Sequence, residues 1–282
     1  MKKFIYLAVF ALSCSVLIFE TVLLKFFNFK MMSSWAFLIV SIAFLGIGAS
    51  GTYLALRTQD IKEVNFSFLF NFVTAYTVSI PLSIMLFAWF PYSPSQRLLF
   101  PNIIFSFFYL LLFSVPFFLS GICISYILSF KELPVGRVLF FDLLGASLGC
   151  ICSVVFLRTL TAYGVLALSV GFAYLAAVIF VLFLIKTNQK TSFYGLKISL
   201  PIFSCVILLV YPHIMLRLYQ IDILSTNRDE EHYKIFKEDF SGRGTTYWNP
   251  ITRIDLSKEG KSDADLYLSG LSEKYRNKKY TG

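Results

Sequence analysis

Four charged residues stand in or beside long apolar stretches of the chain, where charge is rare. Lys25 follows Glu20 about one and a half helical turns later, and Asp142 follows Arg137 at the same spacing. A charged side chain inside a bilayer costs about 3 kcal/mol unless it is paired or solvated. These residues therefore predict one of two arrangements. One is a polar site within the membrane for a substrate, a proton or a lipid headgroup. The other is a set of ion pairs with Lys25, Arg137 or Arg158 that fixes helix ends.

Two glycine-rich stretches suggest either a binding motif or a surface for helix packing. Residues 46–51 (GIGASG) have the letters of the dinucleotide-binding fingerprint, which requires a tight turn between a strand and a helix. Here the stretch lies inside an apolar run with no strand before it. We therefore interpret it, and the similar stretch 145–149, as small-residue surfaces for close helix packing. The glycines concerned are Gly46, Gly48, Gly51, Gly145 and Gly149.

The remaining reactive residue types predict neither catalysis nor a metal or cofactor site. His213 and His232 are far apart, and the cysteines lack the paired spacing of zinc ligands. All the cysteines fall in apolar runs, so buried structural thiols are expected. They are Cys14, Cys123, Cys150, Cys152 and Cys205.

The elements that must position these residues are membrane helices. Of the 282 residues, 57% are hydrophobic and 15% are charged, against roughly 25% charged in soluble domains. This composition excludes a soluble globular enzyme for most of the chain. The apolar runs are continuous and lack the alternation of a membrane barrel, so the prediction is an all-α, polytopic helical bundle of about seven spans. The expected spans are 4–24, 34–56, 66–90, 102–129, 138–157, 162–185 and 196–216.

The charge is distributed so unevenly that it divides the chain into two parts. Residues 1–218 contain 14 Lys and Arg against 5 Asp and Glu, whereas residues 219–282 contain 11 of each. The first part is predicted to be the transmembrane bundle and the second a short polar, soluble tail. The basic excess of the bundle lies in short loops, where it is typical of cytoplasmic loops and not of nucleic-acid binding.

Orientation and the termini leave alternatives open. The N-terminus and the loops on its side of the membrane contain nine basic residues, whereas the loops on the other side contain four. This excess places the N-terminus in the cytoplasm, and seven spans would then place the tail outside. The weakest span, 138–157, contains an acid near its start and would reverse this result if it re-entered the membrane without crossing. The first apolar run resembles a signal peptide, but its length favours a retained helix.

The polar landmarks resemble those of a known family. Residues 116–121 (PFFLSG), 136–138 (GRV) and 141–146 (FDLLGA) occur in order, as in the membrane region of the multi-pass spermidine-synthase-like proteins. Phe19-Glu20 resembles that family's first-helix acid, although Lys25 stands where Arg is usual. Residues 248–255 (WNPITRID), and then 270–272 (GLS), resemble the segment that leads into the family's soluble domain.

The resemblance implies a membrane part that precedes an aminopropyltransferase-type domain. The glycine-rich donor-binding loop of that domain is not found before Gly282, so no catalytic or cofactor-binding residue is carried over. The expectation is a non-catalytic protein of the cell (plasma or inner) membrane that anchors or serves a polyamine-type enzyme. The alternative is a transporter of a small cationic or lipid-like solute. The expected partners are the lipid bilayer and such an enzyme, with no nucleic acid.

Overall fold

The structure is a computed structural model of the whole chain. It describes residues 2–30, 36–57, 66–89, 100–130, 133–157, 160, 162–186, 202–203, 206, 245–248 and 253–256.

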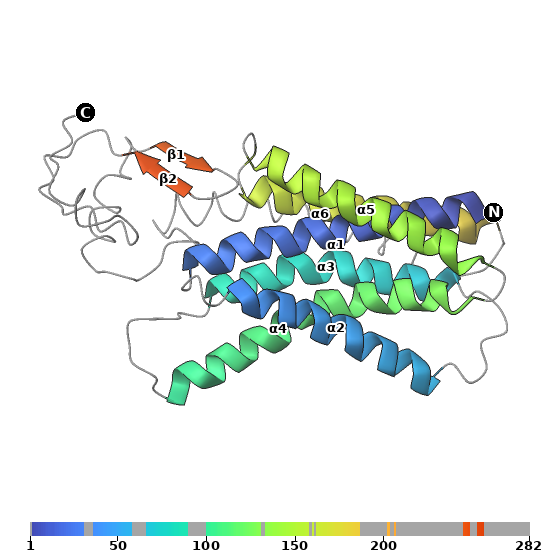
Figure 1. Cartoon of the computed structure of the whole chain (residues 1–282), viewed down its shortest axis with the longest axis horizontal. Coiled ribbons are helices and arrows are strands. Elements are labelled where there is room, and N and C mark those ends of the chain that lie inside the picture. The colour runs from blue at the N-terminus through green and yellow to red at the C-terminus, as the bar shows by residue number, and fades with distance from the viewer. Residues whose placement is uncertain are drawn as a thin grey trace, which may run out of the picture.

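Six long helices make up the membrane part of the described chain (Figure 1). Each is long and apolar enough to cross a membrane, which confirms the all-α, multi-pass bundle. The predicted span 196–216 lies almost entirely outside the described residues. The helices are α1 (Lys2–Lys30), α2 (Ala36–Arg57), α3 (Phe66–Trp89), α4 (Phe100–Leu128), α5 (Val135–Phe156) and α6 (Ala162–Lys186).

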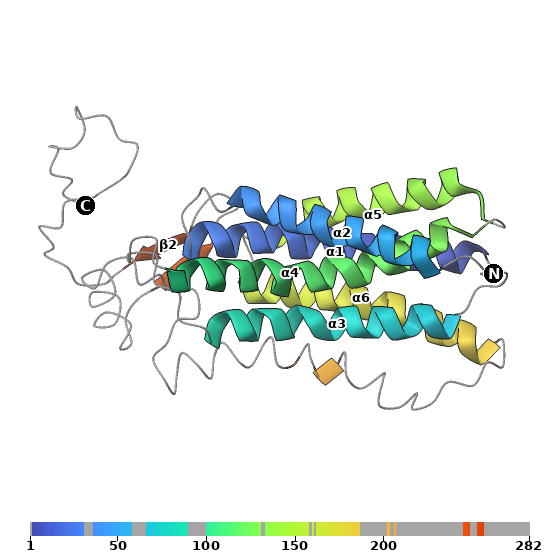
Figure 2. The ribbon, with the colours of Figure 1, turned by 90° about the horizontal axis from the view of Figure 1, so that it is seen from below.

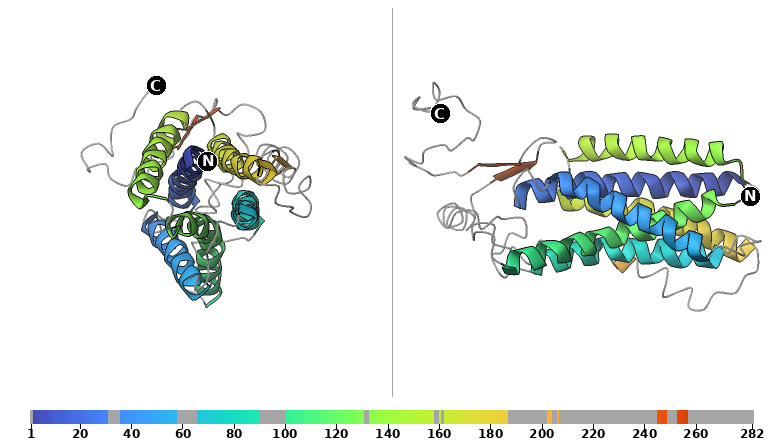
Figure 3. Two further views of the ribbon diagram at one scale, coloured as in Figure 1. Left: turned by 90° about the vertical axis from the view of Figure 1, so that its right-hand side faces the viewer. Right: turned by 60° about the horizontal axis from the view of Figure 1, so that its bottom comes forward.

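Helix α1 lies between its neighbours and supplies much of the core. It packs against α5 on one side and against α6 on another, while α3 packs on both α4 and α6 (Figures 2 and 3). Aromatic rings fill the space between α1, α3 and α4. Phe27 stacks on Phe87 with ring centroids 5.3 Å apart, and Phe113 meets Phe27 edge-on at 5.2 Å. These interlocking rings fix the relative positions of the three helices.

Helix α5 is continuous from Val135 to Phe156 and begins directly after Pro134. Its 22 residues extend about 33 Å, enough for a hydrocarbon core of about 30 Å. A re-entrant segment would need a turn within the helix, and α5 has none. Only 22% of the membrane-spanning residues of α5 are buried against other helices. Helix α5 therefore lies at the edge of the bundle, and most of its surface can face lipid.

The glycines of α2 face in two directions, which the packing prediction did not distinguish. A Cβ atom at Gly46 would lie 2.7 Å from the carbonyl oxygen of Ser114 on α4, so Gly46 does allow close helix packing. Among the described residues, a Cβ atom at Gly48 or Gly51 would meet nothing within 4 Å. These two residues stand on the exposed face of α2, so they make no close helix contact within the described chain.

A short antiparallel hairpin is described in the polar tail. Strand β1 (Thr245–Trp248) pairs with β2 (Arg253–Leu256), with Thr245 opposite Leu256. Residues 253–256 alternate between polar and apolar side chains, a pattern typical of a strand. The hairpin lies beyond the end of the bundle opposite the N-terminus, whereas α6 ends near the N-terminus (Figures 1 and 3).

Candidate functional site

Helices α1 and α5 run parallel and meet backbone to backbone. A Cβ atom at Gly149 would lie 2.5 Å from the carbonyl oxygen of Cys14, and one at Gly145 would clash with the carbonyl oxygen of Phe10. Both contacts have the same offset along the chain, which defines the parallel register. Small residues four apart on one helix face allow this approach, as the sequence predicted for Gly145 and Gly149. We call this contact the α1–α5 seam.

The carboxyl group of Asp142 lies in the α1–α5 seam and is hydrogen-bonded to the hydroxyl of Ser13 on α1. Ser13 is buried and Asp142 is half-buried. The Ser13 hydroxyl also lies 2.9 Å from the carbonyl oxygen of Val9. It has one hydrogen for two acceptors. It can therefore donate to only one of the two oxygens at a time, the Asp142 carboxyl oxygen or the Val9 carbonyl oxygen.

Glu20 is the second acid of the seam. It follows Ser13 by seven residues, so it lies on nearly the same face of α1 about 10 Å further along the helix. Its side chain is half-buried and within electrostatic range of Cys150 on α5. It accepts no hydrogen bond within the described part of the chain. The two predicted acids therefore line one contact between two helices.

The two predicted basic residues do not pair with these acids. Among the described residues, Glu20 forms no ion pair with Lys25 and Asp142 forms none with Arg137. A spacing of five residues turns the side chains about 140° apart around a helix, which points them in different directions. Lys25 is half-buried and interacts with another group, whereas Arg137 is exposed at the start of α5. Arg158 lies outside the described residues.

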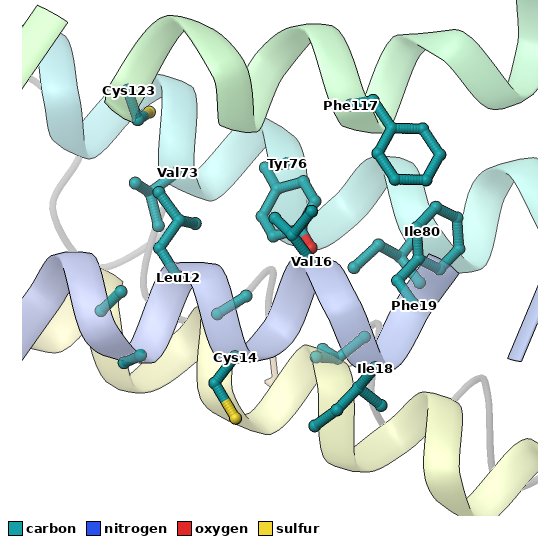
Figure 4. Packing of buried hydrophobic residues seen from close by; sticks show 14 of the residues in the cluster. Leu12, Cys14, Val16, Ile18, Phe19, Val73, Tyr76, Ile80, Phe117 and Cys123 are labelled. Carbon is teal, nitrogen blue, oxygen red and sulfur yellow. The ribbon is translucent and has the colours of Figure 1, made fainter. Parts of the chain in front are cut away.

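A second polar cluster lies on the opposite side of α1, deep in the core. The hydroxyl of Tyr76 on α3 is 3.0 Å from that of Ser15 on α1. Ser169 on α6 donates to the carbonyl oxygen of Ser15 at 2.8 Å, and Ser15 donates to the carbonyl oxygen of Ser169 at 2.7 Å. All three residues are fully buried. Figure 4 shows Tyr76 among apolar side chains of α1 and α3. We call this cluster the hydroxyl node.

Sequence reasoning missed the serines of both clusters. Ser13, Ser15 and Ser169 look like ordinary serines in apolar runs, which most often bond to the backbone of their own helix. Ser83 and Ser120, for example, do so. The one signal was helical spacing, because Ser13 lies seven residues before Glu20 on the same face of α1.

The α1–α5 seam places two carboxylic acid side chains at the edge of the bundle. Asp142 and Glu20 are both reachable without opening the apolar core, so they can attract a cation or carry a proton. The described residues contain no group of three His, Cys, Asp or Glu side chains arranged to hold a metal ion.

Comparisons with known proteins identify no relative of this chain. No protein-family model matches the chain, and no curated protein and no solved structure is significantly similar to it.

Proposed function

We propose that this chain is a membrane part of the spermidine-synthase-like type, which holds an aminopropyltransferase-type enzyme at the cell (plasma or inner) membrane. The observation that carries the proposal is the hairpin of β1 and β2 beyond one end of the bundle. Its strands overlap the two ends of residues 248–255, the stretch that resembles the lead-in to the family's soluble domain. The proposed role of the bundle is therefore to present this hairpin to a soluble protein.

The hairpin suits this role because it is an incomplete sheet. It has two strands in the described chain, so each strand keeps one edge whose backbone groups have no partner strand. A hairpin of two strands is only marginally stable in water, and free edges pair readily with further strands. Strand addition to the sheet of a soluble enzyme would stabilise the hairpin and join the two proteins.

Photocrosslinking from the hairpin tests the proposal. A benzoyl-phenylalanine placed at Thr246 in β1 is activated in intact membranes, and the crosslinked proteins are identified by mass spectrometry. The expected product is an adduct with an aminopropyltransferase-type enzyme. The matched control carries the same group at Leu56, which is 81% exposed on α2 and far from the hairpin. Adducts equally abundant from both positions, or none from Thr246, would count against the proposal.

The position of the hairpin adds a requirement on orientation. The N-terminus and the hairpin lie at opposite ends of the bundle (Figure 1). A cytoplasmic enzyme therefore requires an N-terminus outside the cytoplasm, whereas the loop charges place it inside. Protease accessibility of an N-terminal tag in sealed vesicles decides which face the hairpin occupies, and so which compartment contains the enzyme.

The α1–α5 seam favours a second candidate function, the binding or transport of a small cationic or lipid-like solute. Asp142 and Glu20 would be its charged contacts, because both are half-exposed at the edge of the bundle. Glu20→Gln and Asp142→Asn keep the side-chain shape and remove the charge. Both are expected to abolish uptake of a short-chain polyamine into vesicles while the protein level in the membrane stays unchanged. Loss of both variants from the membrane would instead assign the acids to folding.

A further inference from the structure

Three free thiols gather at the α1–α5 seam, which neither proposed function uses. Cys14 of α1 is fully buried, and Cys150 and Cys152 of α5 are half-buried. Both of the others lie within electrostatic range of Cys14. The described residues contain no set of three ligands placed for a metal.

The close backbone contact at Gly149 places Cys14 beside the helical turn of α5 that contains Cys152. A Cβ atom at Gly149 would lie 3.1 Å from the Cα atom of Cys14. Adding one C–C bond of about 1.5 Å places the Cα atoms of Cys14 and Gly149 within about 5 Å. Cys152 stands less than one helical turn beyond Gly149. Disulfides need Cα atoms about 4.4–6.8 Å apart, a separation this contact can provide.

The direction of the side chains distinguishes Cys152 from Cys150. Around α5, Cys152 stands about 60° from Gly149 and Cys150 about 100° to the other side. Cys150 shares its side of the seam with Glu20. Figure 4 shows Cys14 on the side of α1 opposite Leu12 and Val16, which point toward α3 and α4.

We propose that Cys14 and Cys152 form a reversible disulfide that ties α5 to α1. The S–S bond forms as two S–H bonds break, and the two electrons and two protons pass to a quinone dissolved in the bilayer, which becomes a quinol. A thiol reductant reverses the step. A lipid-soluble acceptor suits the site because it is within the membrane and α5 is at the edge of the bundle. The bond would fix a helix whose main packing partner is α1.

Counting thiols in the full-length protein tests the proposal. Isolated membranes are treated with dithiothreitol or with a fully substituted benzoquinone, which cannot add to thiols. The protein is then unfolded in detergent with a polyethylene-glycol maleimide, and adducts are counted on a gel. The chain has five cysteines, so reduced protein is expected to carry five adducts. Quinone-treated protein is expected to carry about three, with full recovery after dithiothreitol.

Variants and mass spectrometry identify the bond. Cys14→Ala and Cys152→Ala are expected to carry four adducts under both conditions, whereas the matched control Cys123→Ala should fall from four to two. In the wild type, the peptides of Cys14 and Cys152 should be found linked within one chain, a result that does not depend on how any variant folds. Five adducts in oxidised wild type, loss of two thiols in Cys152→Ala, or a covalent dimer would each overturn the proposal.

Discussion

The two sides of α1 solve the problem of polar groups in a membrane differently. Toward α3 and α6, the hydroxyl node is fully buried, and each serine donates to the other's backbone. Toward α5, the seam holds Asp142 and Glu20 half-buried, and Glu20 accepts no hydrogen bond within the described chain. The first arrangement satisfies its polar groups internally, whereas the second leaves carboxylates able to meet another group.

The polar groups on one side of α1 therefore stabilise the fold, whereas those on the other side are available for chemistry. A satisfied neutral hydroxyl network costs little to bury and fixes how three helices pack. A carboxylate at the edge of the bundle contributes little to packing and is costly in hydrocarbon, so its presence favours a role in binding or proton transfer. Substitutions on the two sides should therefore have different consequences, as the following predictions specify.

The largest effect is expected where α5 meets the backbone of α1. Gly149→Leu would place a side chain where even a Cβ atom lies 2.5 Å from the Cys14 carbonyl oxygen. Backbone cannot move aside by changing rotamer, so the free energy of unfolding should fall by about 3 kcal/mol or more. We expect a much lower midpoint of thermal unfolding in detergent and more aggregate in size-exclusion chromatography.

Gly48→Leu is the matched control for this prediction. Gly48 also lies in a membrane helix, but a Cβ atom there would meet no described residue within 4 Å. Leucine favours helix over glycine by about 0.8 kcal/mol, so stability should be unchanged or slightly higher. Equal tolerance of both substitutions would mean that α5 does not pack on α1 through its glycines.

An intermediate effect is expected at the hydroxyl node. Ser169→Ala removes the 2.8 Å bond to the Ser15 carbonyl oxygen and the contact between the two hydroxyls. The free energy of unfolding should fall by about 1–2 kcal/mol, and by about 0.5–1 kcal/mol in Tyr76→Phe, which loses one hydroxyl. Thermal unfolding in detergent measures both. The free energy of unfolding should fall less in the double variant than the sum of the two single losses, because both side chains contact Ser15. Strict additivity would contradict a connected network.

The sequence was sufficient to predict the helices but not how they contact one another. Apolar runs long enough for a bilayer located all six described helices, because few other structures satisfy backbone groups in lipid. The contact at Gly145 and Gly149 was also predictable, since small residues four apart make one flat face. The same reasoning could not place Gly48 and Gly51 on the exposed face of α2, because the sequence of a helix does not reveal which side meets a neighbour.

The candidate site was predictable only in its acids. Glu20 and Asp142 were conspicuous because charge is rare in apolar runs, and they proved to line the same seam. Their surroundings depend on the parallel register of α1 and α5, which are more than 100 residues apart in the chain. No local pattern encodes that register, so neither Ser13 as the partner of Asp142 nor the contact of Gly149 with the backbone of Cys14 could be predicted.

The smallest effect on stability is expected at Asp142, and it decides what the seam is for. Asp142→Asn keeps the shape of the side chain and an oxygen that can accept the Ser13 hydroxyl hydrogen. Because the residue is half-exposed at the edge of the bundle, the free energy of unfolding should change by less than about 0.5 kcal/mol. Thermal unfolding beside Ser169→Ala provides the comparison. If Asp142→Asn were as damaging as Ser169→Ala, the carboxylate would be structural and the contrast between the two sides of α1 would disappear. A stable variant that has lost solute uptake would instead assign the charge of Asp142 to function, because shape, hydrogen bonding and folding would all be preserved.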